Sequence, residues 1–384
     1  MDAEIHLHDP SAFSPSKPHL LVFFISGNPG VIEYYRIFLT HLYGLLSSAS
    51  TPSGSSENIS SPFRDYNIHV YGRNLAGFGT NGCRNNFDDD EDVRRRLPLS
   101  LKEQVEYVED AIDDIVERIL KSNDARQKAG AAVQVIPMGH SVGGYIAMEV
   151  LRRRKEWIMQ LGNTETNGFN RISWQICTGV LLTPSVTKLA DSESGKRVYS
   201  WVIRPTFAAR ISQIAKAITT FIPSRLLISL IGFVTGFPQS GVETTVAFLK
   251  SPMGVQQALH MARDELLEIT TDRWNDDIWG SSGGGGSASI SPLPQNNPHV
   301  PLYFLFAAHD HWIDACRDAL IPLRAYNPER DGERLTGPGK RKPFMEVDGE
   351  IGFPHAFSLA YSVPVAKKVA GYIEDGLRRL EIPR

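Results

Sequence analysis

The segment from Val133 to Val150, VQVIPMGHSVGGYIAMEV, combines a potential nucleophile with the local structure that a nucleophile needs. An apolar β-strand pattern leads into Gly139-His140-Ser141-Val142-Gly143, and a helical pattern follows. This order predicts a nucleophile elbow, a sharp turn that exposes the Ser141 hydroxyl at the head of a helix. Glycines suit the flanking positions because they have no Cβ to clash. The alternative is a glycine-rich turn whose serine has no chemical role.

An activated serine needs a base within hydrogen-bond reach and an acid that orients the base. In α/β sheets with such an elbow, the acid and then the histidine follow the serine along the chain. Asp310 comes directly after the apolar run Val300–Ala307, and His355 lies on a loop before the closing helix. We therefore predict Ser141 as nucleophile, Asp310 as acid and His355 as base.

Other interpretations of the segment around Asp310 remain open. Asp314 is an alternative acid, although it lies a helical turn further along the chain. His309 and His311 are alternative bases, but they flank Asp310 too closely to be oriented by it and also reach the serine. A metal could bind His-Asp-His, yet this spacing matches no tight zinc pattern. We therefore predict no metal and no cofactor.

Acyl transfer also needs hydrogen-bond donors for the oxyanion. One donor is the backbone N–H that follows the nucleophile, here that of Val142. The other comes from the loop after an early strand, which corresponds to Ser26–Gly30. Asn28 lies at the centre of this loop, and we predict that its N–H is the second donor.

The composition is that of a globular protein, with 384 residues, 42% hydrophobic residues and a formal net charge of −3. The negative charge argues against a nucleic-acid partner. Three widely spaced cysteines indicate a reducing compartment without a disulfide framework. The polar start, MDAEIHLHDP, predicts no secretory signal, and no uncharged apolar run reaches the ~20 residues that span a bilayer.

Strand and helix patterns alternate along most of the chain, which predicts an α/β fold with a mostly parallel sheet and helices on both faces. A capping box at Ser100 and Glu103 begins the clearest helix. The other helices are expected at Val31–Leu46 and Phe357–Leu380. The expected strands are His19–Ile25, Tyr66–Tyr71, Ala132–Pro137, Trp174–Leu182, Val300–Ala307 and Pro343–Val347.

Two segments interrupt this alternation. Pro184–Trp279 has helical patterns without a strand pattern, and Gly280–Pro298, with SSGGGGSAS inside it, is typical of a flexible linker. We therefore expect a first part of the core in residues 1–183, a helical cap with its linker in 184–298, and a second part of the core in 299–384. Residues 184–279 are called the helical insertion below.

The helical insertion has the composition of a segment that binds a membrane surface. Gly195–Val242 contains six Lys or Arg residues and no Asp or Glu. Basic groups suit anionic headgroups, and apolar side chains suit the acyl region below them. The alternative is an ordinary cap whose apolar residues pack over the active site. The predicted lipid-binding side chains are Leu226, Leu227, Leu230, Ile231 and Phe233.

From about Leu20 to Tyr372 the chain resembles the lipid droplet-associated hydrolase family, which has the α/β-hydrolase fold. The resemblance rests on four motifs: Ser26-Gly27-Asn28-Pro29-Gly30 with Tyr34-Tyr35 and Phe38 after it, Gly139–Tyr145, Asp310-His311-Trp312, and His355-Ala356-Phe357. It implies the same Ser-Asp-His roles, a neutral-lipid ester substrate, and a location on lipid droplets or the cytosolic face of the endoplasmic reticulum. The chain departs from the family at Ser26, where proline is more common, and in apparent insertions at Ser47–Pro62 and Gly280–Pro298.

The function predicted from the sequence is hydrolysis of neutral-lipid esters, such as sterol esters or acylglycerols, at the droplet surface through an acyl-enzyme. One alternative is a droplet-binding structural protein with little catalysis, because a fold does not prove turnover. Another is an esterase or thioesterase for small soluble substrates, which would not need the basic, apolar insertion.

Overall fold

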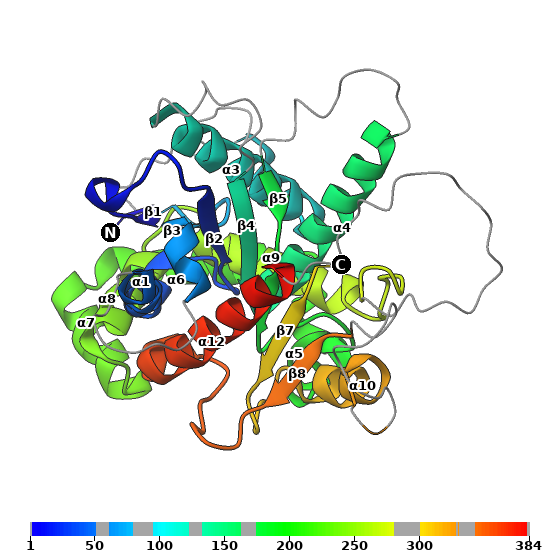
Figure 1. The fold of residues 1–384 in the computed structure, drawn as a ribbon. Helices are drawn as coiled ribbons and strands as arrows, with labels where there is room; N and C mark the ends of the chain where they lie inside the picture. The colour runs from blue at the N-terminus through cyan, green and yellow to red at the C-terminus, as the bar shows by residue number, and fades with distance from the viewer. Residues whose placement is uncertain are drawn as a thin grey trace.

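The predicted alternation of strands and helices forms one eight-stranded sheet in the computed structural model (Figure 1). The structure describes residues 2–50, 61–79, 95–122, 133–162, 174–279, 300–327, 329 and 342–381. The strand order is β1-β3-β2-β4-β6-β7-β8, and β5 also pairs with β4. The strands are β1 (Glu4–Leu7), β2 (His19–Ile25), β3 (Asn67–Arg73), β4 (Val133–His140), β5 (Trp174–Ile176), β6 (Gly179–Leu182), β7 (Leu302–Phe306) and β8 (Phe344–Val347).

Every pairing in the sheet is parallel except that of β1 with β3. The interior strand β2, HLLVFFI, is buried along its whole length, as expected for a parallel strand covered on both faces. Because β2 and β4 run parallel, with Ile25 opposite Gly139, the loops after both strands meet at one edge of the sheet. Ligands in open α/β sheets bind at this side, beyond the carboxyl ends of the strands.

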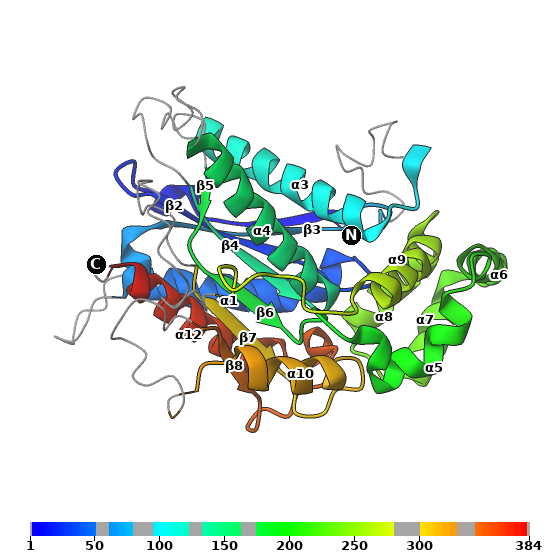
Figure 2. The ribbon, with the colours of Figure 1, turned by 90° about the vertical axis from the view of Figure 1, so that its right-hand side faces the viewer.

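Helices cover both faces of the sheet (Figure 2). One face packs against α3 (Leu101–Ser122), α4 (Val142–Gly162) and α10 (Asp314–Arg324). The other packs against α1 (Arg36–Ser50) and α12 (Ser362–Glu381). Side chains of the two faces thus form two apolar clusters separated by the sheet, and the predicted fold class is confirmed.

The helical insertion lies between β6 and β7, and its described part contains five α-helices at one end of the molecule (Figure 2). Among them, α7 and α8 form a small apolar cluster of their own around Leu227 and Val242. The helices are α5 (Glu193–Val202), α6 (Phe207–Phe221), α7 (Ser224–Thr235), α8 (Gln239–Leu249) and α9 (Gly254–Glu268). The predicted linker Gly280–Pro298 lies outside the described residues.

Some element boundaries differ from those expected. The helix predicted at Val31–Leu46 begins with a 3-10 turn at Ile32–Tyr35, and α1 continues to Ser50, four residues beyond the expected end. The closing helix is likewise divided into a 3-10 turn at Phe357–Leu359 and α12. The edge strand β1 was not predicted.

In the described residues, no single helix has the length and apolar composition needed to cross a bilayer. One pair, Ser224–Thr235 with Gln239–Leu249, reaches the required length and composition only when taken together, and it is bent by 120°.

Candidate active site

Ser141 occupies a strained turn between β4 and α4. Its φ of 54° lies in the left-handed region, which non-glycine residues rarely adopt. The flanking positions have no space for a side chain. A Cβ at Gly139 would lie 2.1 Å from the Gly143 carbonyl oxygen, and a Cβ at Gly143 would lie 2.2 Å from the Ile25 carbonyl oxygen. The turn therefore has the geometry of a nucleophile elbow.

The three predicted catalytic side chains meet in one hydrogen-bonded chain. His355 Nε2 lies 3.0 Å from Ser141 Oγ, and His355 Nδ1 lies 2.6 Å from Asp310 Oδ2. The Asp310 side chain is fully buried, and its second oxygen accepts the Trp312 N–H. An imidazole held in this way on a carboxylate can accept a proton from a serine hydroxyl.

The alternative candidates lie elsewhere. Asp314 accepts the N–H of Ala315 at the start of α10. His311 is exposed, and its Nδ1 pairs with Glu193 on α5 of the helical insertion. The geometry thus brings together the acid and base preferred from the sequence.

A second histidine lies beneath the site and holds two of its loops. The Tyr35 hydroxyl accepts the Gly27 N–H at 3.2 Å and lies 2.8 Å from His140 Nδ1. His140 Nε2 lies 2.9 Å from the His355 carbonyl oxygen. Burial first, and then the nearby His355, lowers the pKa of His140 to about 3. A neutral His140 with its proton on Nε2 satisfies every partner, so this chain links the Asn28 loop to the His355 loop.

The predicted oxyanion donors lie on either side of Ser141. Val142 is the first residue of α4, where a backbone N–H has no partner within the helix. Asn28 follows Gly27, which packs closely against the serine: a Cβ at Gly27 would lie 3.0 Å from Ser141 Cβ. Both backbone N–H groups therefore belong to segments packed around the serine.

The side chain of Asn28 is held by the helical insertion. Its Nδ2 donates to the Ala258 carbonyl and to Glu265 Oε1, both at 2.9 Å, from α9. Burial raises the pKa of Glu265 to about 8, although the hydrogen bond from Asn28 opposes the shift. Glu265 is thus a buried acid beside the site that the sequence pattern did not reveal.

The loop that carries His355 is fixed by a second carboxylate missed in the sequence. The Asp348 side chain is fully buried and accepts the backbone N–H groups of Ile351 and Gly352. Lys368 on α12 lies 3.5 Å from it. The sequence signal for this arrangement was available, because Asp348 directly follows β8 and begins a glycine-containing turn.

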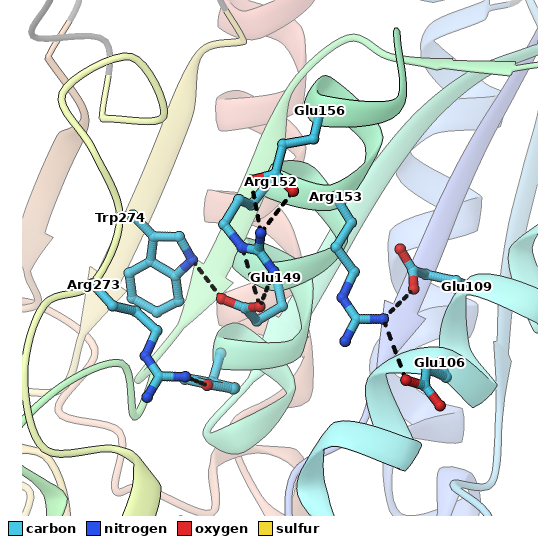
Figure 3. A network of polar contacts seen from close by, with 9 residues as sticks. Glu106, Glu109, Glu149, Arg152, Arg153, Glu156, Arg273 and Trp274 are labelled. Atoms are coloured by element: carbon cyan, nitrogen blue, oxygen red, sulfur yellow. Dashed lines mark hydrogen bonds and ion pairs between the residues drawn. The ribbon is translucent and has the colours of Figure 1, made fainter. Parts of the chain in front are cut away.

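Polar contacts hold α4, the helix headed by Ser141, against its neighbours (Figure 3). The buried Glu149 carboxylate accepts the Trp274 indole N–H at 2.9 Å and pairs with Arg152. On the other side, Arg153 pairs with Glu109 of α3 at 2.8 Å. These contacts fix α4 both to α3 and to the segment after α9, near the end of the helical insertion.

The five predicted lipid-binding residues divide between two faces of α7. Leu227 and Ile231 face inward and pack against α8. Leu226, Leu230 and Phe233 face outward, and Phe233 is 90% exposed. Val234 extends this exposed apolar surface, which we call the outer face of α7, and Phe221 at the end of α6 is also exposed. The six basic residues of the segment, Lys196, Arg197, Arg204, Arg210, Lys216 and Arg225, are all exposed.

The parallel sheet, the strand–turn–helix at Ser141 and the hydrogen-bonded Ser-His-Asp set define the chain as an α/β hydrolase. The peroxisomal alpha-beta-hydrolase of Saccharomyces cerevisiae shares this fold, with a TM-score of 0.50, 12% identity, and coverage of 95% of this chain and 78% of that one. The family model for lipid-droplet associated hydrolases matches residues 18–358, so the chain belongs to that family.

Curated relatives agree with this assignment. The lipid droplet-associated hydrolase of Gallus gallus is 23% identical over 377 residues, which cover 96% of this chain and 88% of the relative. That of Mus musculus is 21% identical over 369 residues, covering 94% and 86%. The resemblance seen in the sequence motifs is therefore confirmed at the level of the family.

Proposed function

We propose that the protein is a serine hydrolase that cleaves neutral-lipid esters, such as sterol esters or acylglycerols, at the surface of lipid droplets. The observation that carries the proposal is the hydrogen-bonded chain from Ser141 Oγ through His355 to the buried Asp310. Family membership supports hydrolysis and association with lipid droplets. The ester substrate and the acyl-enzyme route are inferred from the residues.

In the proposed reaction, His355 Nε2 takes the proton of Ser141 as Oγ attacks the ester carbonyl carbon. The backbone N–H groups of Asn28 and Val142 donate hydrogen bonds to the oxyanion. Loss of one such donor typically raises the activation barrier by about 3 kcal/mol. The protonated His355, stabilised by Asp310, then donates to the leaving alcohol. Water, deprotonated by His355, releases the acyl group from Ser141.

The proposed docking surface combines the outer face of α7 with the six exposed basic residues of Gly195–Val242. An apolar side chain contributes ~1.5–3 kcal/mol when it is buried completely. Each cation near an anionic surface contributes ~1 kcal/mol. The proposed partner is accordingly the phospholipid monolayer of a droplet, or the cytosolic surface of the endoplasmic reticulum.

Activity-based labelling tests the chemistry. A fluorophosphonate probe should label the wild type and fail on Ser141→Ala. Purified protein should then hydrolyse emulsified triacylglycerol or sterol ester. Labelling without turnover of any ester would favour a droplet-binding protein with little catalysis, and turnover confined to soluble esters or thioesters would favour the third alternative. Equal labelling of both proteins would remove Ser141 as the nucleophile.

A separate experiment tests docking. Replacing Leu226, Leu230 and Phe233 with serine should release the tagged protein from droplets in lipid-loaded cells, whereas Ser141→Ala should stay bound. Leu323→Ser is the matched control, because Leu323 is exposed to a similar degree but lies on α10. Droplet binding that survives the triple substitution would contradict the assignment of this surface.

A further inference from the structure

Four histidines gather at the end of the sheet opposite Ser141, where the proposed function gives them no role. His19 is the first residue of β2, whereas Ser141 follows the last residue of the parallel strand β4. The separation is about the length of a seven-residue strand, ~20 Å. The other members are His6 and His8, at the edge strand β1, and His69 of β3.

Strand pairing explains how these residues meet. His6 and His8 are two positions apart, so their side chains leave the strand on the same side. In the antiparallel register of β1 with β3, Leu7 lies opposite Val70. One further step along the same register brings His8 opposite His69. The motif His-x-His therefore faces a third histidine across the edge of the sheet.

The ring nitrogens lie at distances that suit a shared metal ion. His6 Nε2 is 3.1 Å from His69 Nδ1, and one nitrogen from each of His6, His8 and His69 falls within 4.8 Å of the others. Two nitrogens bound to Zn²⁺ at 2.0–2.1 Å with tetrahedral angles lie about 3.3 Å apart. The His6–His69 pair already has nearly this spacing, and the exposed His8 ring needs only a small movement to join it.

A fourth histidine supports the orientation that a ligand needs. His69 Nε2 lies 3.0 Å from His19 Nδ1, and both residues are buried. Histidines that bind metals usually donate their second ring N–H to a neighbouring acceptor, which fixes the ring and its tautomer. With Nε2–H donating to His19, the lone pair of His69 Nδ1 is directed at the shared position.

We propose that His6, His8 and His69 bind one divalent transition-metal ion, with His19 as the positioning residue for His69. Imidazole ligands favour Zn²⁺, Cu²⁺ and Ni²⁺, while the absence of oxygen donors from this set disfavours Mg²⁺ and Ca²⁺. The exposed position of His8 leaves the fourth coordination site open to water. The neighbouring Arg118 is paired with Glu4 at 3.0 Å, so its charge is offset.

Metal binding here would act on the edge of the sheet. The strand β1 is a four-residue strand at the edge of the sheet, and its strand partner among the described residues is β3. An ion that joins His6 and His8 to His69 would cross-link β1 to β3. A ligand that binds the folded chain and not the unfolded one increases the free energy of unfolding. Once the free ligand concentration exceeds Kd, this increase grows with the logarithm of the ratio of that concentration to Kd.

The test uses the full chain without a polyhistidine tag, because such a tag binds the same ions. After treatment with EDTA, Zn²⁺ is titrated by calorimetry in a buffer that does not coordinate metals. We expect one ion per chain, an affinity at least tenfold weaker in His8→Ala, and a rise of Tm on addition of Zn²⁺ that His8→Ala loses. With one equivalent of Cu²⁺, electron paramagnetic resonance should show coupling to imidazole nitrogens.

Two comparisons keep the result interpretable. His8 is exposed, so His8→Ala should fold, and its Tm without metal verifies this. The matched control is His41→Ala, since His41 is an exposed histidine on α1. Loss of binding in His8→Ala but not in His41→Ala supports the site. Stoichiometric binding that is unchanged in His8→Ala, or no binding by the wild type, would overturn it.

Discussion

Replacing Glu265 with glutamine is expected to stabilise the protein, by an amount that grows as the pH rises from about 5 to about 8. Burial raises the pKa of Glu265 from its ordinary value of 4.5 to about 8. The folded protein therefore retains a proton that the unfolded chain loses between these pH values. A group of this kind lowers stability as the pH increases, because the folded state binds more protons than the unfolded state.

The size of the effect follows from the two pKa values. Each pH unit in this window costs the folded wild type ~1.4 kcal/mol relative to the unfolded chain. The full difference between pH 4.5 and about 8 is therefore on the order of 4–5 kcal/mol. Above pH 8 the cost stays constant. Glutamine has no such cost, and its side-chain oxygen can still accept the Asn28 amide N–H.

Urea unfolding of the wild type and Glu265→Gln, at pH values about one unit apart between about 5 and 9, measures this difference. Groups that do not interact with Glu265 affect both proteins equally, so the difference between the two curves reports Glu265 together with its interaction with Asp264. The matched control is Glu243→Gln, which changes an exposed carboxylate on α8 of the same insertion and should follow the wild type at every pH. If Glu265→Gln also runs parallel to the wild type, Glu265 is not a buried acid, and the contact between α9 and the Asn28 loop is wrongly described.

Three further predictions test the site itself. Asp310→Asn should lower kcat by roughly 10³–10⁴-fold, because an amide no longer stabilises the protonated His355, while Asp314→Asn should keep near wild-type kcat; the reverse order would reassign the acid. Tyr35→Phe removes the hydroxyl between Gly27 and His140 and should lower kcat several-fold or more while the protein stays folded by circular dichroism; unchanged kcat would show that this contact does not position the site. Gly143→Ala should yield little soluble protein, since its Cβ has no space at the elbow, and normal expression would contradict that packing.

The order of motifs along the chain predicted the parallel strands and the candidate catalytic residues, because functional groups in such sheets follow the ends of the strands. Buried parallel strands read as continuous apolar runs, and functional groups follow their carboxyl ends. Ser141, Asp310 and His355 could therefore be found from the sequence, although 169 and 45 positions separate them along the chain. The same logic does not detect β1, because its four residues, EIHL, are too few and too mixed to form an apolar run.

The single strand predicted at Trp174–Leu182 is divided into β5 and β6 in the structure. The division depends on a contact with a distant segment, which local sequence patterns do not predict. Among the described strands, the first half, β5, pairs with β4 alone. At Thr178 the hydroxyl donates to the Pro301 carbonyl, which also accepts the Gly179 N–H. From there β6 pairs with both β4 and β7. The interruption thus marks where the chain gains a second neighbour in the sheet.

Tertiary packing also explains why the buried face of α7 and the burial of Glu265 were not predictable. The sequence of α7, SRLLISLIGFVT, is apolar around most of the helix, so periodicity cannot tell the inner face from the outer one. Glu265 lies in ARDELLE, where an acidic residue normally faces solvent. It is buried because α9 packs against the Asn28 loop, a contact across 237 positions of the chain.

The position of α7 connects the proposed docking surface to the proposed chemistry. Leu227 and Ile231 bind the helix to α8, and α8 reaches the segment after Asn28 through the 2.9 Å hydrogen bond between Thr245 and Tyr34. A lipid surface can shift the conformation of a protein only by the difference in its affinity for the two conformations. If α7 moves when its exposed side chains enter lipid, burial of these side chains makes the affinity of the lipid surface higher for the moved conformation. Because α8 packs against α9, and α9 binds the Asn28 side chain, that movement would reach the loop of one oxyanion donor through direct contacts.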